Sequence, residues 1–217
     1  TLSLLMGFGA ISTDLYLPAM PTIGQALKAD AGSIELTISG FLVGFSVGQL
    51  IWGPISDKYG RRVPIAAGIA LFILGSAGCA MAQSASAMIA WRIVQAVGAC
   101  AGVALGRAMV RDHYEGARAA RMLSILITVM SIAPLLGPLL GGQILATAGW
   151  RAIFWLLVAV GFGTLVLVAT LPETLPERNR NRDLLVRALV RYGELLGRQR
   201  LLGYAGVGAF FYAGAFA

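Results

Sequence analysis

The chain has 217 residues, of which 58% are hydrophobic and only 12% charged, and its mean hydropathy is +0.78. These values lie far outside the usage of soluble domains and exclude a conventional water-soluble protein. A formal net charge of +7 could suggest a nucleic-acid partner, but the positions of the cations, described below, argue against that class.

Six nearly uncharged segments follow one another, each about long enough to cross a hydrocarbon core of ~30 Å as a helix. They cover residues 2–27, 37–55, 63–82, 87–108, 122–146 and 152–171, and a seventh begins near Leu201. The predicted fold class is therefore an all-α membrane protein. We expect a bundle of six transmembrane helices over residues 1–171, a cytoplasmic linker over 172–200 and the start of a seventh transmembrane helix over 201–217.

The linker is the longest polar stretch of the chain. Its arginines recur beside Leu, Val and Tyr over residues 184–202, which predicts an amphipathic helix lying on the inner leaflet. A disordered charged linker is the alternative.

The cations predict how the bundle is oriented. If the loop that contains Asp57 is cytoplasmic, all but three of the 17 Lys and Arg lie on that side, the exceptions being Lys28, Arg92 and Arg151. Such a bias is the positive-inside pattern. The basic composition thus reports topology, with anionic lipid headgroups as counter-charge, and nucleic acid is not an expected partner.

Asp14 and Arg92 are ionisable residues inside predicted spans. A charge at mid-membrane costs at least ~2.5 kcal/mol on insertion scales, so such residues are functional candidates by default. Counting ~1.5 Å per residue from the outer face brings the two within reach of each other if spans one and four adjoin, and we expect them to pair. Alternatively, Asp14 caps the kink at Pro18 and Pro21 while Arg92 extends its charged end towards the interface.

A second charged cluster lies between spans two and three, in the loop from Gly53 to Arg62. Gly53 permits close helix approach, Gly60 permits a turn with positive φ, and Asp57 can accept hydrogen bonds from backbone or arginine. Asp112, at the inner end of span four, is the best partner for Arg61. Alternatively, the loop is a charged turn that only fixes topology.

Glycines recur with helical spacing on two spans. Gly40, Gly44 and Gly48 share one face of span two, and spacing of this kind lets helix backbones approach closely. Span four carries a similar face: Gly98, Gly102 and Gly106. Span five should be bent, because its prolines remove backbone donors and its glycines lower rigidity. The prolines and glycines of span five are Pro134, Gly137, Pro138, Gly141 and Gly142. Close packing alone and a role in rocking motions are both open for these residues.

Redox, metal and enzyme chemistry are not expected. Cys79 and Cys100 both lie inside predicted spans as small apolar residues, and His113 has no second His or Cys nearby. No nucleophile, base or metal constellation is visible. We therefore expect no cofactor and no enzyme.

Several motifs together resemble the major facilitator superfamily. Segment 53–62 resembles its signature between helices two and three, and segment 92–98 (Arg-Ile-Val-Gln-Ala-Val-Gly) resembles its fourth-helix signature, although Ala96 stands where Gly is usual. Segment 133–142 is similar to the fifth-helix signature of the drug antiporters. Residues 13–21 (Thr-Asp-Leu-Tyr-Leu-Pro-Ala-Met-Pro) and 171–174 (Leu-Pro-Glu-Thr) resemble the Bcr/CflA drug-resistance branch.

The resemblance implies the amino-terminal half of a twelve-span transporter, built from two inverted three-helix repeats, and we expect the chain to be a fragment or a truncated product. It also implies a drug–proton antiporter of the bacterial inner membrane that is driven by the proton gradient and exports amphipathic small molecules. The implied coupling site is Asp14, Tyr16, Arg92 and Gln95. The loop, with Asp112, becomes a gating latch against the second half, and the fifth span becomes a hinge.

The expected partners are substrate, protons, lipids and either the carboxy-terminal half or a second copy of the chain. Two other functions stay open. One is a proton-linked carrier of a metabolite such as a nucleoside or amino-acid derivative. The other is a half-length membrane module that dimerises without transport.

Overall fold

The structure is a computed structural model that describes residues 2–170, 173–176, 178, 180, 193–194, 197 and 199–216. The helices are α1 (Leu2–Asp14), η1 (Leu17–Ala19), α2 (Met20–Leu27), α3 (Ala31–Tyr59), α4 (Arg62–Met81), α5 (Ala85–His113), α6 (Gly116–Met130), α7 (Ala133–Ala148), α8 (Trp150–Ala169) and α10 (Gln199–Phe216). No strand occurs in these ranges, so the predicted all-α class is confirmed.

Five helical segments are long and apolar enough to cross a membrane, counting the described residues only. They are α3, α4, α5, the pair α6–α7 and α8. The predicted first span corresponds to α1, η1 and α2 in succession, with only 13 residues in α1 and 8 in α2. Each predicted apolar segment of the bundle therefore has its helical counterpart.

Contacts divide the chain into two units, Thr1–Arg180 and Asn181–Ala217. The first holds the bundle together with the described residues that follow α8, and the second holds α10. Most of the predicted amphipathic helix, residues 184–202, lies outside the described residues. The predicted domain limits stay predictions.

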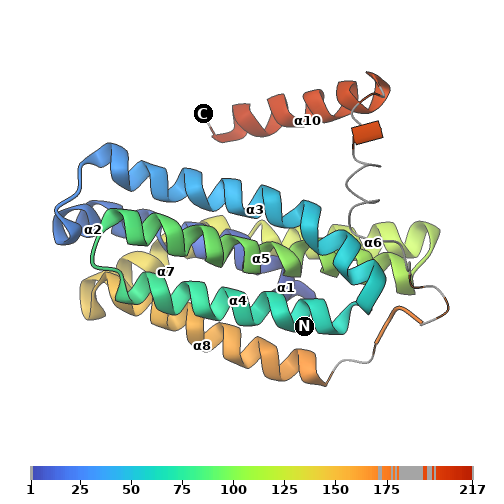
Figure 1. Ribbon diagram of the computed structural model, residues 1–217, viewed down its shortest axis with the longest axis horizontal. Helices are drawn as coiled ribbons and strands as arrows, with labels where there is room; N and C mark the ends of the chain where they lie inside the picture. The colour runs from blue at the N-terminus through green and yellow to red at the C-terminus, as the bar shows by residue number, and fades with distance from the viewer. Residues whose placement is uncertain are drawn as a thin grey trace. The chain divides into compact units, whose positions relative to one another are not determined.

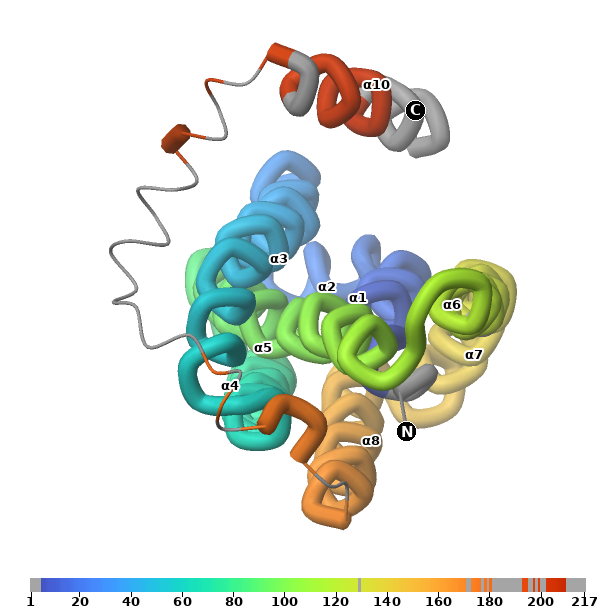
Figure 2. The backbone as a smooth tube through the Cα atoms, turned by 90° about the vertical axis from the view of Figure 1, so that its right-hand side faces the viewer, coloured from blue at the N-terminus to red at the C-terminus, as the bar shows by residue number. Residues whose placement is uncertain are grey.

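Within the first unit, α5 lies at the centre and packs on α3, α4 and α1, while α4 also packs on α8 and α1 on α7 (Figures 1 and 2). Glycines make these contacts close. A Cβ at Gly44 of α3 would lie 2.7 Å from the carbonyl oxygen of Ile93, and one at Gly98 of α5 would overlap the backbone of Phe72. Close packing of the predicted glycine faces is confirmed by these contacts.

Proline interrupts the first and fifth spans. Pro18 and Pro21 follow the end of α1, and because proline has no backbone N–H, each removes a helical hydrogen bond and favours the break there. In the fifth span α6 ends at Met130 and α7 begins at Ala133, with Pro134 in its first turn. The expected bend is therefore present, whereas Pro138 lies within α7.

The second span is longer than the sequence predicted. Helix α3 runs on through Pro54 to Tyr59, so Asp57 lies in the last helical turn and not in a loop as expected. Lys58 in this last turn suits the negative end of the helix dipole, and Asp57 pairs with Arg61 just beyond the helix end. The connection shrinks to Gly60 and Arg61. Gly60 has φ +88°, which confirms the predicted positive φ.

Candidate functional site

The guanidinium of Arg92 is buried at the centre of the bundle, with none of the residue exposed. It lies over two aromatic rings, 4.5 Å from the ring centroid of Tyr16 and 4.3 Å from that of Phe41. Its Nη1 donates to Gln95 Oε1 at 2.8 Å and to the carbonyl oxygen of Ser12 at 3.2 Å. Ring faces and neutral acceptors therefore surround this cation.

Among the described residues, no carboxylate pairs with Arg92. The ion pairs found there include those of Arg61 with Asp57 and Asp112. Nε and Nη2 of Arg92 have no hydrogen-bond partner there, and neither has Oδ2 of Asp14. The predicted Asp14–Arg92 pair is therefore wrong for this conformation, as is the alternative in which Arg92 reaches towards the interface.

Helix geometry explains the missing pair. Successive residues of an α-helix are rotated by about 100°, so Ser12 and Asp14 point in nearly opposite directions from α1. The Ser12 side chain is fully buried, and the backbone carbonyl oxygen of Ser12 accepts from Arg92 of α5, whereas Asp14 faces α7, where a Cβ added to Gly137 would overlap the Cβ of Asp14. Gly141, one turn further along α7, lies just as closely on the backbone of Leu15.

Tyr16 and Gln95 each extend the buried polar cluster to another helix. The Tyr16 hydroxyl lies 2.6 Å from Thr37 Oγ1 of α3, and because Thr37 donates its only proton to the carbonyl oxygen of Ile34, Tyr16 is the donor. Gln95 Nε2 donates to Ser76 Oγ of α4 at 2.8 Å. The predicted residues Tyr16, Arg92 and Gln95 thus meet, while Asp14 lies apart.

Sequence reasoning missed four residues of this cluster: Ser12, Phe41, Thr37 and Ser76. Ser12, Thr37 and Ser76 are polar residues in apolar segments, which is only a weak indication of a functional site. Phe41 gave no indication at all, because aromatic residues are common in apolar membrane spans.

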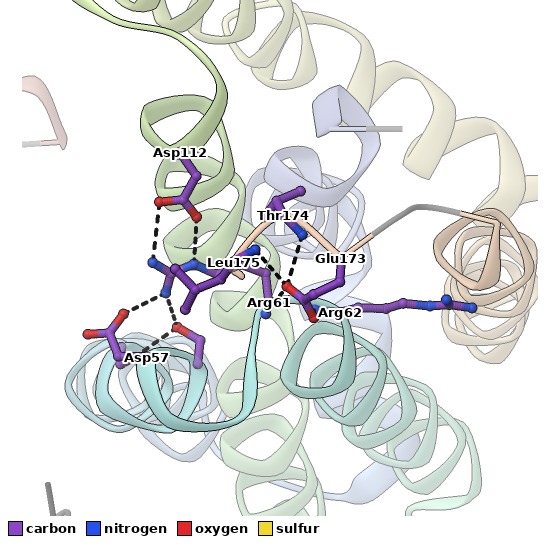
Figure 3. A network of polar contacts seen from close by, with 9 residues as sticks. Asp57, Arg61, Arg62, Asp112, Glu173, Thr174 and Leu175 are labelled. Carbon is purple, nitrogen blue, oxygen red and sulfur yellow. Dashed lines mark hydrogen bonds and ion pairs between the residues drawn. The ribbon is translucent and has the colours of Figure 1, made fainter. Parts of the chain in front are cut away.

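A second network lies where α3 and α4 join (Figure 3). Arg61 Nη1 donates to Asp57 Oδ1 and Ser56 Oγ, both at 2.6 Å, and Nε donates to Asp112 Oδ2 at 2.8 Å. The predicted Arg61–Asp112 pair is confirmed. Burial lowers the pKa of Arg61, but the hydrogen bonds and charges of Asp112 and Asp57 outweigh it, so that pKa is raised.

Glu173 completes this network from the chain beyond α8. Its Oε1 accepts backbone N–H groups from Arg61 at 2.8 Å, Thr174 at 2.9 Å and Leu175 at 3.0 Å, and Oε2 accepts that of Arg62 at 3.2 Å. Burial raises the pKa of Glu173, but these four donors outweigh it and hold that pKa below its usual range. Sequence reasoning quoted Glu173 within a motif but gave it no role.

The remaining predicted loop residues lie around this network. Gly53 is in helix α3, and Arg62 opens α4 and donates from Nη2 to the carbonyl oxygen of Ala169, near the end of α8. In the fifth span, Pro134 lies in the first turn of α7 and Pro138 further inside it, and Gly142 has open space where a Cβ would stand. Their proposed hinge role stays a prediction.

Arg151, at the start of α8, contacts the other end of α4. Its Nε donates to the carbonyl oxygen of Ala80 at 3.1 Å and Nη2 to that of Ala82 at 3.3 Å. Its guanidinium also lies 4.1 Å from the ring centroid of Trp150. Arg61 and Arg62 thus lie at one end of the bundle and Arg151 at the opposite end, as the positive-inside pattern predicts.

Together, the apolar helices and buried polar residues define a multi-pass helical membrane protein. A family model described as Major Facilitator Superfamily matches residues 2–217. The chain belongs to this superfamily.

Similar proteins include several bacterial members of the superfamily. The chain is 37% identical to the uncharacterized MFS-type transporter YdgK of Bacillus subtilis, covering 100% of the chain and 54% of that protein. It is 35% identical to a chloramphenicol resistance protein of Pseudomonas aeruginosa (93% and 49% covered). It is 33% identical to a bicyclomycin resistance protein homolog of Haemophilus influenzae (100% and 54% covered). The names of the last two agree with the resemblance to the Bcr/CflA branch.

The chain spans about half the length of the curated relatives it matches. Among solved structures, the human organic anion transporter MFSD10 (TETRAN) superposes with a TM-score of 0.67 at 21% identity, covering 84% of this chain and 49% of that one. This likeness supports the fold: the bundle is part of a major facilitator architecture.

Proposed function

We propose that the chain is part of a drug–proton antiporter that exports amphipathic small molecules across a bacterial inner membrane. Family membership supports a transporter rather than an enzyme. The substrate class follows the names of the chloramphenicol and bicyclomycin resistance relatives. The proton gradient is the energy source, and no cofactor is required.

The observation that carries proton coupling is the separation of the half-buried carboxylate of Asp14 from the fully buried guanidinium of Arg92. Arg92 is held by Tyr16, Phe41 and Gln95 and so does not need a carboxylate to keep its place. Asp14 is therefore left to bind and release a proton without breaking an ion pair, and its Oδ2 is shielded and has no hydrogen-bond partner among the described residues. In this proposal Asp14 is the proton site, while Arg92, Tyr16 and Gln95 form a buried polar cluster that links the helices beside the transport path.

The gating part of the proposal concerns Gly53, Asp57, Gly60, Arg61, Arg62 and Asp112. Their network ties the inner ends of α3, α4 and α5 together, so breaking it would loosen that end of the bundle. The partner of this latch is the carboxy-terminal half of the transporter or a second copy of the chain.

Everted membrane vesicles from cells that express the gene provide the test. Uptake of chloramphenicol into these vesicles should depend on an imposed proton gradient and collapse with an uncoupler. Uptake of a nucleoside or amino-acid derivative instead would favour the metabolite carrier. Absence of any gradient-dependent flux would favour a module that does not transport.

A further inference from the structure

The start of helix α4 lacks local stabilisation. Its N-cap residue, Arg61, makes no side-chain cap, and no acidic residue occurs in its first turn. Arg61 and Arg62 instead place two cations there, although the N-terminal end of a helix dipole favours anions. The free N–H groups of this end therefore need an acceptor from elsewhere.

Glu173 is that acceptor, and it comes from 112 residues further along the chain (Figure 3). Its carboxylate binds the N–H groups of Arg61 and Arg62 on one side and those of Thr174 and Leu175 on the other. One side chain thus joins the first turn of α4 to the chain that leaves α8.

Gly60 leaves room for the carboxylate of Glu173. A Cβ at Gly60 would lie 2.5 Å from Glu173 Oε2 and 2.8 Å from its Cδ, and the φ of +88° would strain any other residue. Glycine at this position therefore serves the turn and also admits Glu173.

Arg61 is consequently held at two points. Glu173 binds its backbone N–H, while Asp57 and Asp112 bind its guanidinium. At the opposite end of the same helix pair, Arg151 holds the carbonyl groups of Ala80 and Ala82. Helices α4 and α8 are each 20 residues long, so residues at or just beyond the two ends of α8 reach the two ends of α4. The anionic Glu173 lies at the positive N-terminal end of the α4 dipole, and the cationic Arg151 at its negative C-terminal end.

We infer that Glu173 is a positioning residue for Arg61: it fixes the backbone from which Arg61 reaches Asp112, so the strength of that ion pair depends on the inner end of α8. Displacement of the chain at residues 173–175 would then weaken the Arg61–Asp112 pair directly. The consequence of this inference for transport rests on the proposed gating function, whereas its test does not, because the test measures unfolding.

The test is a double-mutant cycle of Arg61→Gln and Asp112→Asn, measured by reversible unfolding of the purified full chain in detergent micelles. The cycle is run with Glu173 present and again with Glu173→Ala. Expressed as a factor in the unfolding equilibrium constant, the Arg61–Asp112 coupling should fall at least threefold in the Ala background. Glu115→Gln, which removes an exposed carboxylate from the turn between α5 and α6, should leave the coupling unchanged.

Glu173→Gln keeps the test decisive if Glu173→Ala does not fold. An amide retains an acceptor oxygen for Arg61, Thr174 and Leu175 but loses the charge and the acceptor for Arg62, so the coupling should take an intermediate value. Unchanged coupling in both Glu173 variants, with a loss of stability alone, would overturn the inference and leave Glu173 as a helix cap only. Because no flux is measured, failure here is distinguishable from failure of the proposed export function.

Discussion

Arg92 and Tyr16 are stacked in the core of the bundle, with the guanidinium carbon 4.5 Å from the centroid of the tyrosine ring. Tyr16 lies just beyond the break in the first span, and Arg92 lies on the central helix α5. Because Tyr16 also donates to Thr37, the stack links spans one, two and four. A cation over an aromatic face is stabilised by about 0.5–2 kcal/mol, more when it is desolvated, as Arg92 is.

Replacing Asp14 with Asn should abolish proton-driven export while the protein still folds. The substitution preserves size but removes the titratable group, and Asp14 makes no ion pair among the described residues that could be lost. We expect drug flux driven by the gradient to fall by about 100-fold or more in vesicles, the order of magnitude that a positioned proton-transfer group contributes. Glu35→Gln, at an exposed position of α3, is the control, and undiminished flux in the Asn variant would remove Asp14 from the mechanism.

Replacing Arg92 with Lys should destabilise the bundle even though the charge is kept. Lysine lacks the planar guanidinium that stacks on Tyr16 and Phe41 while its Nη1 donates to Gln95 and Ser12. Losing a hydrogen bond of a charged group costs about 1.5–3 kcal/mol, which an unfolding titration in micelles would detect. The exposed Arg118→Lys should be neutral. Equal stability of the Arg92 and Arg118 variants would mean that only the charge of Arg92 matters.

Replacing Gly137 with Ala should disturb the contact between the first and fifth spans. The added methyl group would overlap the Cβ of Asp14, and overpacking of this kind costs about 1–3 kcal/mol. Gly142→Ala is a matched control in the same helix, because nothing lies within 4 Å of the added Cβ. Both variants are compared by unfolding and by flux. If they behave alike, the Asp14–Gly137 contact does not constrain the site.

Stability should depend on pH through Glu173. Its pKa in the folded protein is lowered by four backbone donors despite burial, so its contribution is fully present above the ordinary glutamate pKa of about 4.3 and is lost as pH falls through the lowered value. Glu173→Gln should therefore reduce stability at neutral pH and flatten the decline on acidification. Unfolding of both proteins between about pH 3 and pH 7 measures the difference. Parallel curves would show that the charge of Glu173 is unimportant.

The sequence alone determined the membrane character and the order of the helices, and it predicts their orientation. Hydropathy over about 20 residues reports whether a helix can cross a bilayer, and the distribution of Lys and Arg reports which ends face inwards; neither depends on how helices meet. The Arg61–Asp112 pair was also predictable, because both residues were expected at the inner ends of neighbouring spans. The bend in the fifth span followed from Pro134, whose missing N–H acts locally.

Tertiary structure decided which faces of the helices meet. Depth in the membrane suggested that Asp14 pairs with Arg92, but the rotation of α1 turns Asp14 towards Gly137 of α7 and leaves Arg92 between Tyr16 and Phe41. Glu173 could not be assigned either, since the backbone N–H groups that donate to its carboxylate, those of Arg61 and Arg62, lie 112 and 111 residues away in the sequence. Helix rotation and contacts over such separations are set by packing of the whole bundle, which no local pattern encodes.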